Sequence, residues 1–222
     1  MNTISVLIPA HNEGERLATT IKALWNTNKI EEIVVIDDGS SDDTAIVASK
    51  YGARVVCSKK NVGKGKALTI GYSFVKGDIV ILVDADLQES ASLTVALVEP
   101  ILKNEADLVI AVFPPDKRGS GFGIARYVAQ VGIKLLTKKS LNAPLSGQRA
   151  LKRKVLADLL PLTPGFGIEV GMTIDALRKS YRIIEMPLNL THCSPGRNVN
   201  GFIHRGKQFY NICTTIGEKL WK

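Results

Sequence analysis

Two carboxylates directly follow an apolar run in the middle of the sequence. Residues 79–83 are Ile, Val, Ile, Leu and Val, and Asp84 and Asp86 come next, beside Gln88. Such a run predicts a strand buried on both faces of a sheet. The carboxyl end of a parallel strand is the usual ligand site in an open α/β sheet, and carboxylates there suit Mg²⁺ or Mn²⁺ carrying a diphosphate. Taken alone, the same residues also fit a solvated loop after a core strand.

Three other loops carry polar groups at the ends of predicted strands. They are residues 9–13 (Pro-Ala-His-Asn-Glu), 37–40 (Asp-Asp-Gly-Ser) and 61–66 (Asn-Val-Gly-Lys-Gly-Lys). In a parallel sheet all of these loops lie on one edge, together with the Asp84 loop. Each loop is weak evidence alone, and their convergence predicts a shared binding site.

The elements that position these loops alternate between strands and helices. Strands are expected at residues 4–8, 32–36, 54–57, 79–83, 107–112 and 182–190. Helices are expected from Asn12, which caps with Glu15 three residues later, from Ser41 or Asp42, and over about 61–75, 93–103, 122–136 and 169–178. This alternation predicts right-handed crossovers and a mostly parallel sheet flanked by helices. A final amphipathic helix is expected, with Phe209, Cys213, Ile216 and Leu220 on one face.

Length and composition indicate a single α/β domain over residues 1–222. The chain is 45% hydrophobic and 23% charged, which is ordinary for a globular protein. It has no apolar run of the roughly 18 residues that a membrane span needs and no signal-peptide pattern at its start. The three cysteines are widely spaced, which favours reduced thiols and a cytoplasmic location.

The net charge of +8 is divided unevenly along the chain. Residues 1–113 carry a net −4, residues 114–160 carry +8 and residues 161–222 carry +4. The acidic residues 1–113 predict cation binding, and the basic residues 114–222 predict contact with phosphate or a membrane. Nucleic acid is disfavoured as a partner because the basic segment lacks interleaved aromatic residues and a binding motif.

The four loops, in order and spacing, resemble the family 2 glycosyltransferases of the GT-A fold. The resemblance covers roughly residues 3–112, and Asp-Ala-Asp-Leu-Gln at 84–88 is most similar to the polyprenyl-phosphate (dolichyl-phosphate) mannosyl- and glucosyltransferases. It implies an NDP-sugar donor, a divalent metal (Mg²⁺ or Mn²⁺) and sugar transfer to an acceptor. It also implies a division into a nucleotide-sugar-binding half, residues 1–113, and an acceptor-binding half, residues 114–222.

The resemblance also assigns roles on the donor side. The residues implied to border the nucleotide are Pro9, Ala10, Glu13, Asp38, Lys64, Asp84 and Ala85. Among them Asp38 would accept a hydrogen bond from the base, Asp84 would lie near the ribose and metal, and Asp86 would bind the metal. Asp37 is interpreted as a turn or capping residue instead.

The back half resembles the acceptor side of GT-A enzymes, especially glucosyl-3-phosphoglycerate synthases. The motifs are residues 144–149 and 165–169. His192 stands where those enzymes have a metal-binding His, and Glu169 would hold sugar hydroxyls or act as a base, or else merely start a helix. Guanidinium groups pair bidentately with phosphate, so the arginines of this half are candidates for binding an anionic acceptor. The alternative is that each is a solvated surface charge. The candidates are Arg118, Arg126, Arg149 and Arg197.

We therefore expect a metal-dependent hexosyltransferase that uses a UDP-sugar, with GDP-mannose as the other donor. The first choice of acceptor is polyprenyl phosphate, which would place the protein peripherally on the inner face of the membrane. The rival acceptor is a small phospho-acid such as 3-phosphoglycerate. Readings of other classes are a sugar-1-phosphate nucleotidyltransferase, a phosphatase and a non-catalytic nucleotide-binding protein. The oligomeric state is left open, with a homo-oligomer among the alternatives.

Overall fold

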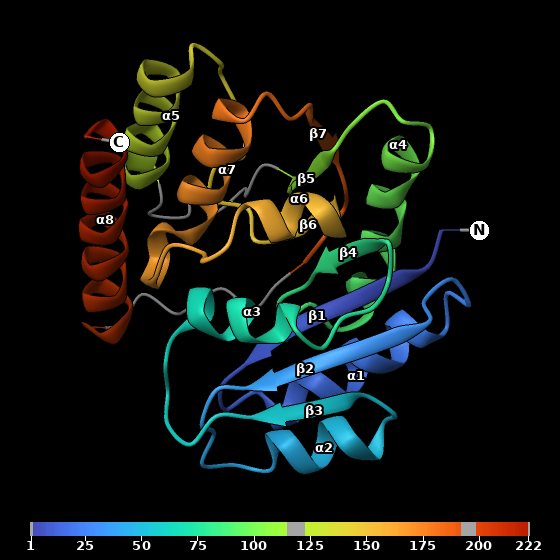
Figure 1. Cartoon of the computed structure of the whole chain (residues 1–222). Coiled ribbons are helices and arrows are strands. Elements are labelled where there is room, and N and C mark those ends of the chain that lie inside the picture. Colours follow the sequence, from blue (N-terminus) through green and yellow to red (C-terminus); the bar gives the residue numbers. More distant parts are fainter. Residues whose placement is uncertain (1, 115–122, 192–198, 222) are drawn as a thin grey trace.

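The strands of one sheet are distributed along most of the sequence, from residue 4 to residue 187. The computed structural model describes residues 2–114, 123–191 and 199–221. Within these residues seven strands pair in the order β3-β2-β1-β4-β6-β5-β7 (Figure 1). Every neighbouring pair is parallel except the two that involve β6, which confirms the predicted mostly parallel α/β sheet. The strands are β1 (Ile4–Ala10), β2 (Glu32–Asp37), β3 (Arg54–Cys57), β4 (Ile79–Leu82), β5 (Leu108–Val112), β6 (Arg149–Lys152) and β7 (Ile183–Pro187).

Helices flank this sheet, and a helical layer lies beyond one of its ends. Figure 1 shows α5 and α8 side by side beyond the end of the sheet to which the arrows of β1, β2 and β3 point. The helical elements are α1 (Gly14–Trp25), α2 (Thr44–Lys50), α3 (Lys64–Tyr72), the 3₁₀ segment η1 (Gln88–Val98), α4 (Glu99–Leu102), α5 (Gly123–Thr137), α6 (Arg153–Asp158), the 3₁₀ turn η2 (Gly165–Gly167), α7 (Ile168–Arg178) and α8 (Val199–Leu220).

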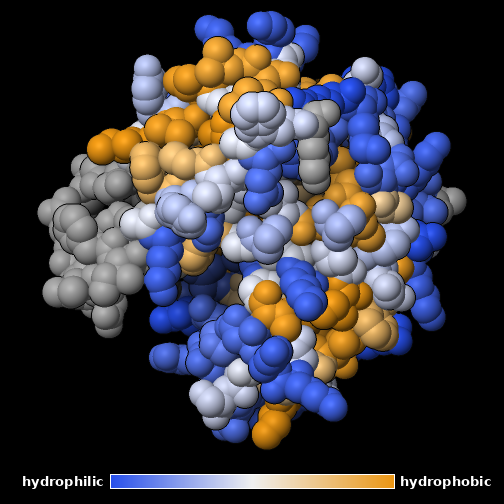
Figure 2. Space-filling view, turned by 60° about the vertical axis from the view of Figure 1, so that its left-hand side comes forward, coloured by the Kyte–Doolittle hydropathy of each residue, from blue (hydrophilic) through white to orange (hydrophobic). Residues whose placement is uncertain are grey.

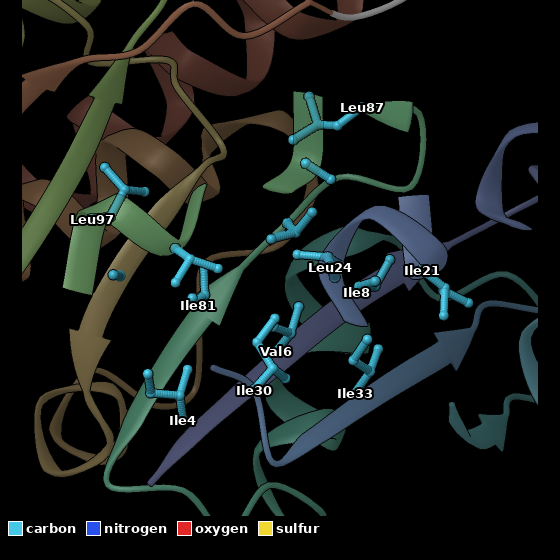
Figure 3. Packing of buried hydrophobic residues seen from close by; sticks show 14 of the residues in the cluster. Ile4, Val6, Ile8, Ile21, Leu24, Ile30, Ile33, Ile81, Leu87 and Leu97 are labelled. Atoms are coloured by element: carbon cyan, nitrogen blue, oxygen red, sulfur yellow. The ribbon is translucent and has the colours of Figure 1, made fainter. Parts of the chain in front are cut away.

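The central strands are buried on both faces because alternate side chains enter two different cores. Val6 and Ile8 of β1 pack with α1 and η1 on one face, whereas Leu7 packs with α3 on the other. Figure 3 shows side chains of β1, β2 and β4 gathered against Ile21 and Leu24 of α1. This two-sided burial is the physical reason for the continuous apolar runs in the sequence.

Strand β6 was not predicted from the sequence. It inserts antiparallel between β4 and β5, and Ile81 pairs with Ala150 in its register. The sequence of β6 is Arg-Ala-Leu-Lys, which has neither an apolar run nor β-branched residues, so propensity gives little signal. Its position in the sheet brings residues 146–148 directly beside the end of β4.

Two local predictions were wrong in detail. Asn12 does not cap α1: it has a φ of 55°, its Oδ1 accepts a hydrogen bond from the Ser41 amide, and Glu13 occupies the N-cap position. The helix expected over residues 93–103 is instead η1 followed by α4. In η1 the hydroxyls of Ser90 and Thr94 donate to carbonyls three residues earlier, and such local bonds compete with α-helical hydrogen bonding.

The C-terminal helix exists as predicted, and its predicted apolar face is only partly covered. Ile216 of that face packs on the neighbouring helices, whereas Phe209, Cys213 and Leu220 are exposed, and Ile212 and Thr215 beside the face are buried. Ile212 packs with α5 and α7 in a third, smaller hydrophobic cluster. None of the helices in the described ranges combines the length and apolarity that crossing a membrane requires.

Candidate active site

The candidate site lies where the strand order reverses between β1 and β4. Starting from β1 the sheet continues to β2 and β3 on one side and to β4 on the other, and such a switch point opens a crevice at the carboxyl ends of the strands. Pro9 and Ala10 end β1 opposite Ile36 and Asp37 of β2. The loop of Asp84 follows β4 at the same edge.

An ion-pair bridge connects this edge to helix α7. The Lys64 ammonium group lies 2.7 Å from Asp84 Oδ1 and 2.9 Å from Glu169 Oε1. Lys64 begins α3 and Glu169 lies in the first turn of α7, so three separate segments meet at one cation. Burial opposes the charge on Lys64, but the two carboxylates outweigh it and raise the pKa of Lys64. The bridge joins predicted residues of the donor side and the acceptor side.

Gln148 and Gly147 complete this bridge. Both lie within the predicted acceptor-side motif 144–149, and neither was given an individual role beside Asp84. The Gln148 side chain is buried, donates to Asp84 Oδ2 at 2.6 Å and accepts from the Asp84 amide at 2.9 Å. A Cβ on Gly147 would lie 2.6 Å from Lys64 Nζ and 2.9 Å from Asp84 Oδ2. Only glycine fits at this position without moving the ion pair. Both residues directly precede β6, so their place beside Asp84 can be predicted only if β6 is recognised as a neighbour of β4.

Arg149 is an interior residue, which corrects its predicted role in acceptor binding. Its side chain is fully buried, and the guanidinium group donates to the carbonyls of Ser146 and Pro144 and to Thr173 Oγ1. Burial lowers the pKa of Arg149 to about 10, against the opposing influence of Glu169 and Glu185. The residue therefore holds the 144–148 loop against α7 and presents no surface to an acceptor.

Asp38 fixes the loop that precedes α3. Its two carboxylate oxygens accept hydrogen bonds from the amides of Val62 and Gly63, at 2.7 and 2.8 Å, and the residue is 4% exposed. Its own amide donates to the Ala10 carbonyl. Asp37 accepts from the Ser40 amide and is thus the turn residue that was predicted. The predicted contact of Asp38 with a base would add to bonds that its carboxylate already makes.

A buried hydroxyl sets the conformation of the loop after Asp84. Thr20 Oγ1 of α1 donates to the Ala85 carbonyl at 2.8 Å and accepts from the Gln88 amide at 2.9 Å. Gln88 has a φ of 50°, a left-handed conformation that a non-glycine residue needs outside support to hold. Thr20 is not among the residues predicted for the site, and no signal in the sequence marks this role.

Carboxylates gather near Asp86, which bears on the predicted metal. Burial raises the pKa of Glu13, partly offset by its ion pair with Arg16, and the charge of Asp86 raises it further. Hard carboxylate oxygens at Asp84 and Asp86 have the right chemistry for Mg²⁺ or Mn²⁺. Within the described residues no group of three or more acidic, His or Cys side chains forms a complete ligand set. The predicted further ligand, His192, lies outside the described residues.

The predicted acceptor residues are only partly within the described structure. Arg118 and Arg197 lie outside the described residues. Arg126 is exposed on α5, which packs against α7 a few residues from Glu169. The structure thus brings Lys64, Asp84 and Glu169 together and leaves Arg126 on the helical layer.

Sequence comparison relates the chain to known sugar transferases. The model of the family described as "Glycosyl transferase family 2" matches residues 5–160. Glucosyl-3-phosphoglycerate synthase of Mycobacterium tuberculosis is 33% identical over 196 residues, which are 78% of this chain and 60% of that protein. The chain therefore spans only about 60% of the length of this relative. Dolichol-phosphate mannosyltransferase of Pyrococcus furiosus is 29% identical over 83% of this chain and 55% of that protein.

Comparison with solved structures gives a similar result. The crystal structure of the Mycobacterium tuberculosis glucosyl-3-phosphoglycerate synthase with Mg²⁺ and UDP has a TM-score of 0.84 and 30% identity, covering 98% of this chain and 79% of that one. The complex of the same enzyme with Mn²⁺, UDP-glucose and phosphoglyceric acid has a TM-score of 0.81 at 30% identity, covering 97% and 80%. These likenesses confirm the predicted GT-A fold.

Gly147→Ala should disturb the site without unfolding the protein. The added Cβ would force Lys64 away from Asp84, so we expect UDP affinity in the presence of Mg²⁺ to fall by about tenfold, the equivalent of one lost charged hydrogen bond. Calorimetric titration with UDP measures this. Gly217→Ala is the matched control, because a Cβ there meets nothing within 4 Å. Equal UDP affinity of both variants would show that the bridge does not shape the nucleotide site.

Asp38→Ala should weaken both the fold and nucleotide binding. It would leave the amides of Val62 and Gly63 without their acceptor, which costs about 1–3 kcal/mol for buried donors. We expect a loss of that size in the urea-unfolding free energy, together with weaker UDP binding. Asp43→Ala, at an exposed position on the same edge, is the control. An unchanged unfolding free energy would mean that the Asp38 contacts contribute nothing to stability.

Proposed function

We propose that this chain, which belongs to glycosyl transferase family 2 and is a glycosyltransferase, moves a sugar from a UDP-sugar to a phosphate-bearing acceptor. The observation that carries the proposal is the bridge of Lys64 between Asp84 and Glu169, because it joins the donor edge of the sheet to the acceptor half. Family membership sets aside the nucleotidyltransferase, phosphatase and non-catalytic readings.

The donor would occupy the crevice at the ends of β1 and β4. Pro9 and Ala10 at the end of β1 and Ala85 after β4 would border the nucleotide, with Glu13 at the start of α1. Asp38 would hold the 61–64 loop in shape and accept from the base. The solved complexes of the mycobacterial relative contain UDP or UDP-glucose, which supports UDP over GDP as the nucleotide.

A divalent metal would be held by Asp86, with Asp84 beside it and His192 as the predicted further ligand. When bound, such an ion supplies Lewis-acid stabilisation of the charge on the departing diphosphate. Lys64 contributes a fixed positive charge at the same edge, and Gln148 holds Asp84 in one orientation through two hydrogen bonds. The mycobacterial relative has been crystallised with Mg²⁺ and with Mn²⁺, which supports either ion here.

On the acceptor side, Glu169 would orient the sugar hydroxyls or take up a proton. Its contact with Lys64 at 2.9 Å holds the side chain at the edge of the site, where its oxygens could serve either role. A phosphate acceptor is already ionised at neutral pH and needs no strong base. Basic groups such as Arg126, and the predicted Arg118 and Arg197, would draw an anionic acceptor to this half.

Polyprenyl phosphate is the acceptor that we propose first. The basic balance of residues 114–222 and the relatives named as undecaprenyl- and dolichol-phosphate transferases support it. The rival, a small phospho-acid, is supported by the likeness to glucosyl-3-phosphoglycerate synthase. With the lipid acceptor the protein would work peripherally at the inner face of the membrane.

Asp86→Ala should abolish metal-dependent turnover. Loss of the metal-bound carboxylate removes several kcal/mol of stabilisation of the transition state, which corresponds to a fall in kcat of about 100-fold or more. Release of UDP from UDP-glucose, measured with Mn²⁺ and with EDTA, tests this. Glu89, three residues further on in η1, is exposed, and Glu89→Ala should keep full activity. If Asp86→Ala were as active as Glu89→Ala, the metal assignment would be wrong.

A panel of acceptors identifies the substrate class. The protein is incubated with UDP-glucose or GDP-mannose and Mn²⁺, and with either polyprenyl phosphate in detergent micelles or 3-phosphoglycerate in buffer. We expect radiolabelled sugar in the organic phase with polyprenyl phosphate. A labelled product formed only from 3-phosphoglycerate would select the rival. If neither acceptor received sugar while an acceptor without phosphate did, the proposal of a phosphate-bearing acceptor would fail.

A further inference from the structure

An apolar strip remains on the surface of the helical layer. On α5 the side chains of Ile124, Tyr127 and Leu135 are 73%, 66% and 66% exposed, and Val131 between them is also exposed. The spacing of these four residues, i, i+3, i+7 and i+11, places them along one side of the helix. The opposite side of α5 is occupied by Ala125, Ala129 and Ile133, which pack against α7 and α8. The strip is therefore a second apolar side that no part of the described chain covers.

The strip continues onto α8. A Cβ on Gly132 would lie 2.3 Å from the Cδ1 of Ile216, so the two helices approach closely there. Phe209 and Leu220 share a side of α8 with Ile216, at spacings of seven and four residues, and both are exposed. We call the six exposed residues on these two helices the α5–α8 face: Ile124, Tyr127, Val131, Leu135, Phe209 and Leu220. Figure 2 shows hydrophobic side chains gathered on the upper part of this side of the molecule, bordered by hydrophilic ones.

Positive charge borders the strip on α5. The sequence of α5 contains no Asp or Glu. The exposed Lys134 lies beside the strip, and Lys138 and Lys139 follow after the helix. A hollow of about 280 Å³ is lined by Val131, Leu135 and the lysines at 134 and 138. Its chemistry, apolar carbon beside two ammonium groups, matches an amphiphile with an anionic headgroup.

We infer that the α5–α8 face docks on a membrane surface that contains anionic lipids. Apolar side chains with aromatic neighbours and a basic border are the features of helices that lie in the plane of such a surface. A second copy of the chain is a poorer occupant, because a two-fold contact places the same patch on both subunits and would bring two lysine-bordered patches together with no acidic side chain on α5 to pair with them.

The position of the face connects it to the active site. Val170 and Ile174 of α7 pack under α5 and α8, and Glu169 of the same helix pairs with Lys64. Docking through this face would hold the acceptor half of the site next to the lipid layer. The link to a lipid acceptor rests on the proposed function, whereas docking itself does not, so vesicle binding is measured without donor or acceptor.

The test is co-sedimentation of the whole chain with vesicles. Vesicles of phosphatidylglycerol and phosphatidylcholine in equal amounts are compared with vesicles of phosphatidylcholine alone, at low and high salt. We expect binding to the anionic vesicles at low salt only. Val131→Ser/Leu135→Ser and Lys134→Glu/Lys138→Glu should each lower the partition coefficient by about tenfold or more, since they remove apolar contact or reverse the charge.

Matched control variants distinguish vesicle binding through the α5–α8 face from nonspecific vesicle binding. Ile46→Ser/Leu102→Ser removes two exposed apolar side chains on α2 and α4, and Lys29→Glu/Lys50→Glu reverses two lysines elsewhere; both should bind like the unmodified chain. Absence of binding to the anionic vesicles, or equal losses in the controls, would overturn the inference. So would a dimer in sedimentation velocity that Val131→Ser/Leu135→Ser converts to a monomer, because a second copy would then occupy the face. Vesicle binding without sugar transfer to polyprenyl phosphate would support docking and contradict the proposed acceptor.

Discussion

The arrangement of the site depends on one cation held between two carboxylates. Asp84 and Glu169 come from distant parts of the chain and would repel one another without Lys64 between them. At an effective dielectric of about 20, each contact of this kind is worth about 4 kcal/mol before desolvation, which is enough to offset that repulsion. Gly147 provides the space for the bridge and Gln148 fixes the orientation of Asp84. The loop after β4, the start of α3 and the start of α7 are thereby held in one geometry.

The sequence predicted the fold of residues 1–113 better than that of residues 114–222. Strands such as β1 and β4 are buried on both faces, so their apolar runs are strong signals, and the loops after them follow from the rule that parallel strands end together. Strand β6 has no such run, and the role of Gln148 therefore stayed hidden. Arg149 was misread because composition cannot distinguish an exposed guanidinium from one that is buried among carbonyls. Thr20 acts through tertiary contacts to Ala85 and Gln88, which spacing along the chain does not reveal.

The two halves differ in how their functional groups are supported. Asp38 and Asp84 are held by backbone amides and buried side chains at the edge of the sheet. The basic groups of α5 lie on a helical layer that packs on α7 through small side chains such as Ala125 and Ala129. A donor shared by the relatives would need the fixed groups at the edge of the sheet. Acceptors that differ between relatives would be accommodated by changes in the helical layer. The uneven charge of the sequence, acidic in front and basic behind, follows the same division.

The antiparallel insertion of β6 has a consequence for the order in which the sheet assembles on the ribosome. Among the described residues β5 pairs only with β6 and β7, and both are synthesised after it. Strands β1 to β4 can all pair with one another once residue 82 has emerged. Strand β5, with the sequence Leu-Val-Ile-Ala-Val, has no partner until β6, residues 149–152, has been synthesised. During that interval an apolar strand has two open edges, which is the kind of segment that aggregates or recruits a chaperone. The nascent chain thus has a vulnerable stage that the finished protein, with β5 fully enclosed, no longer shows.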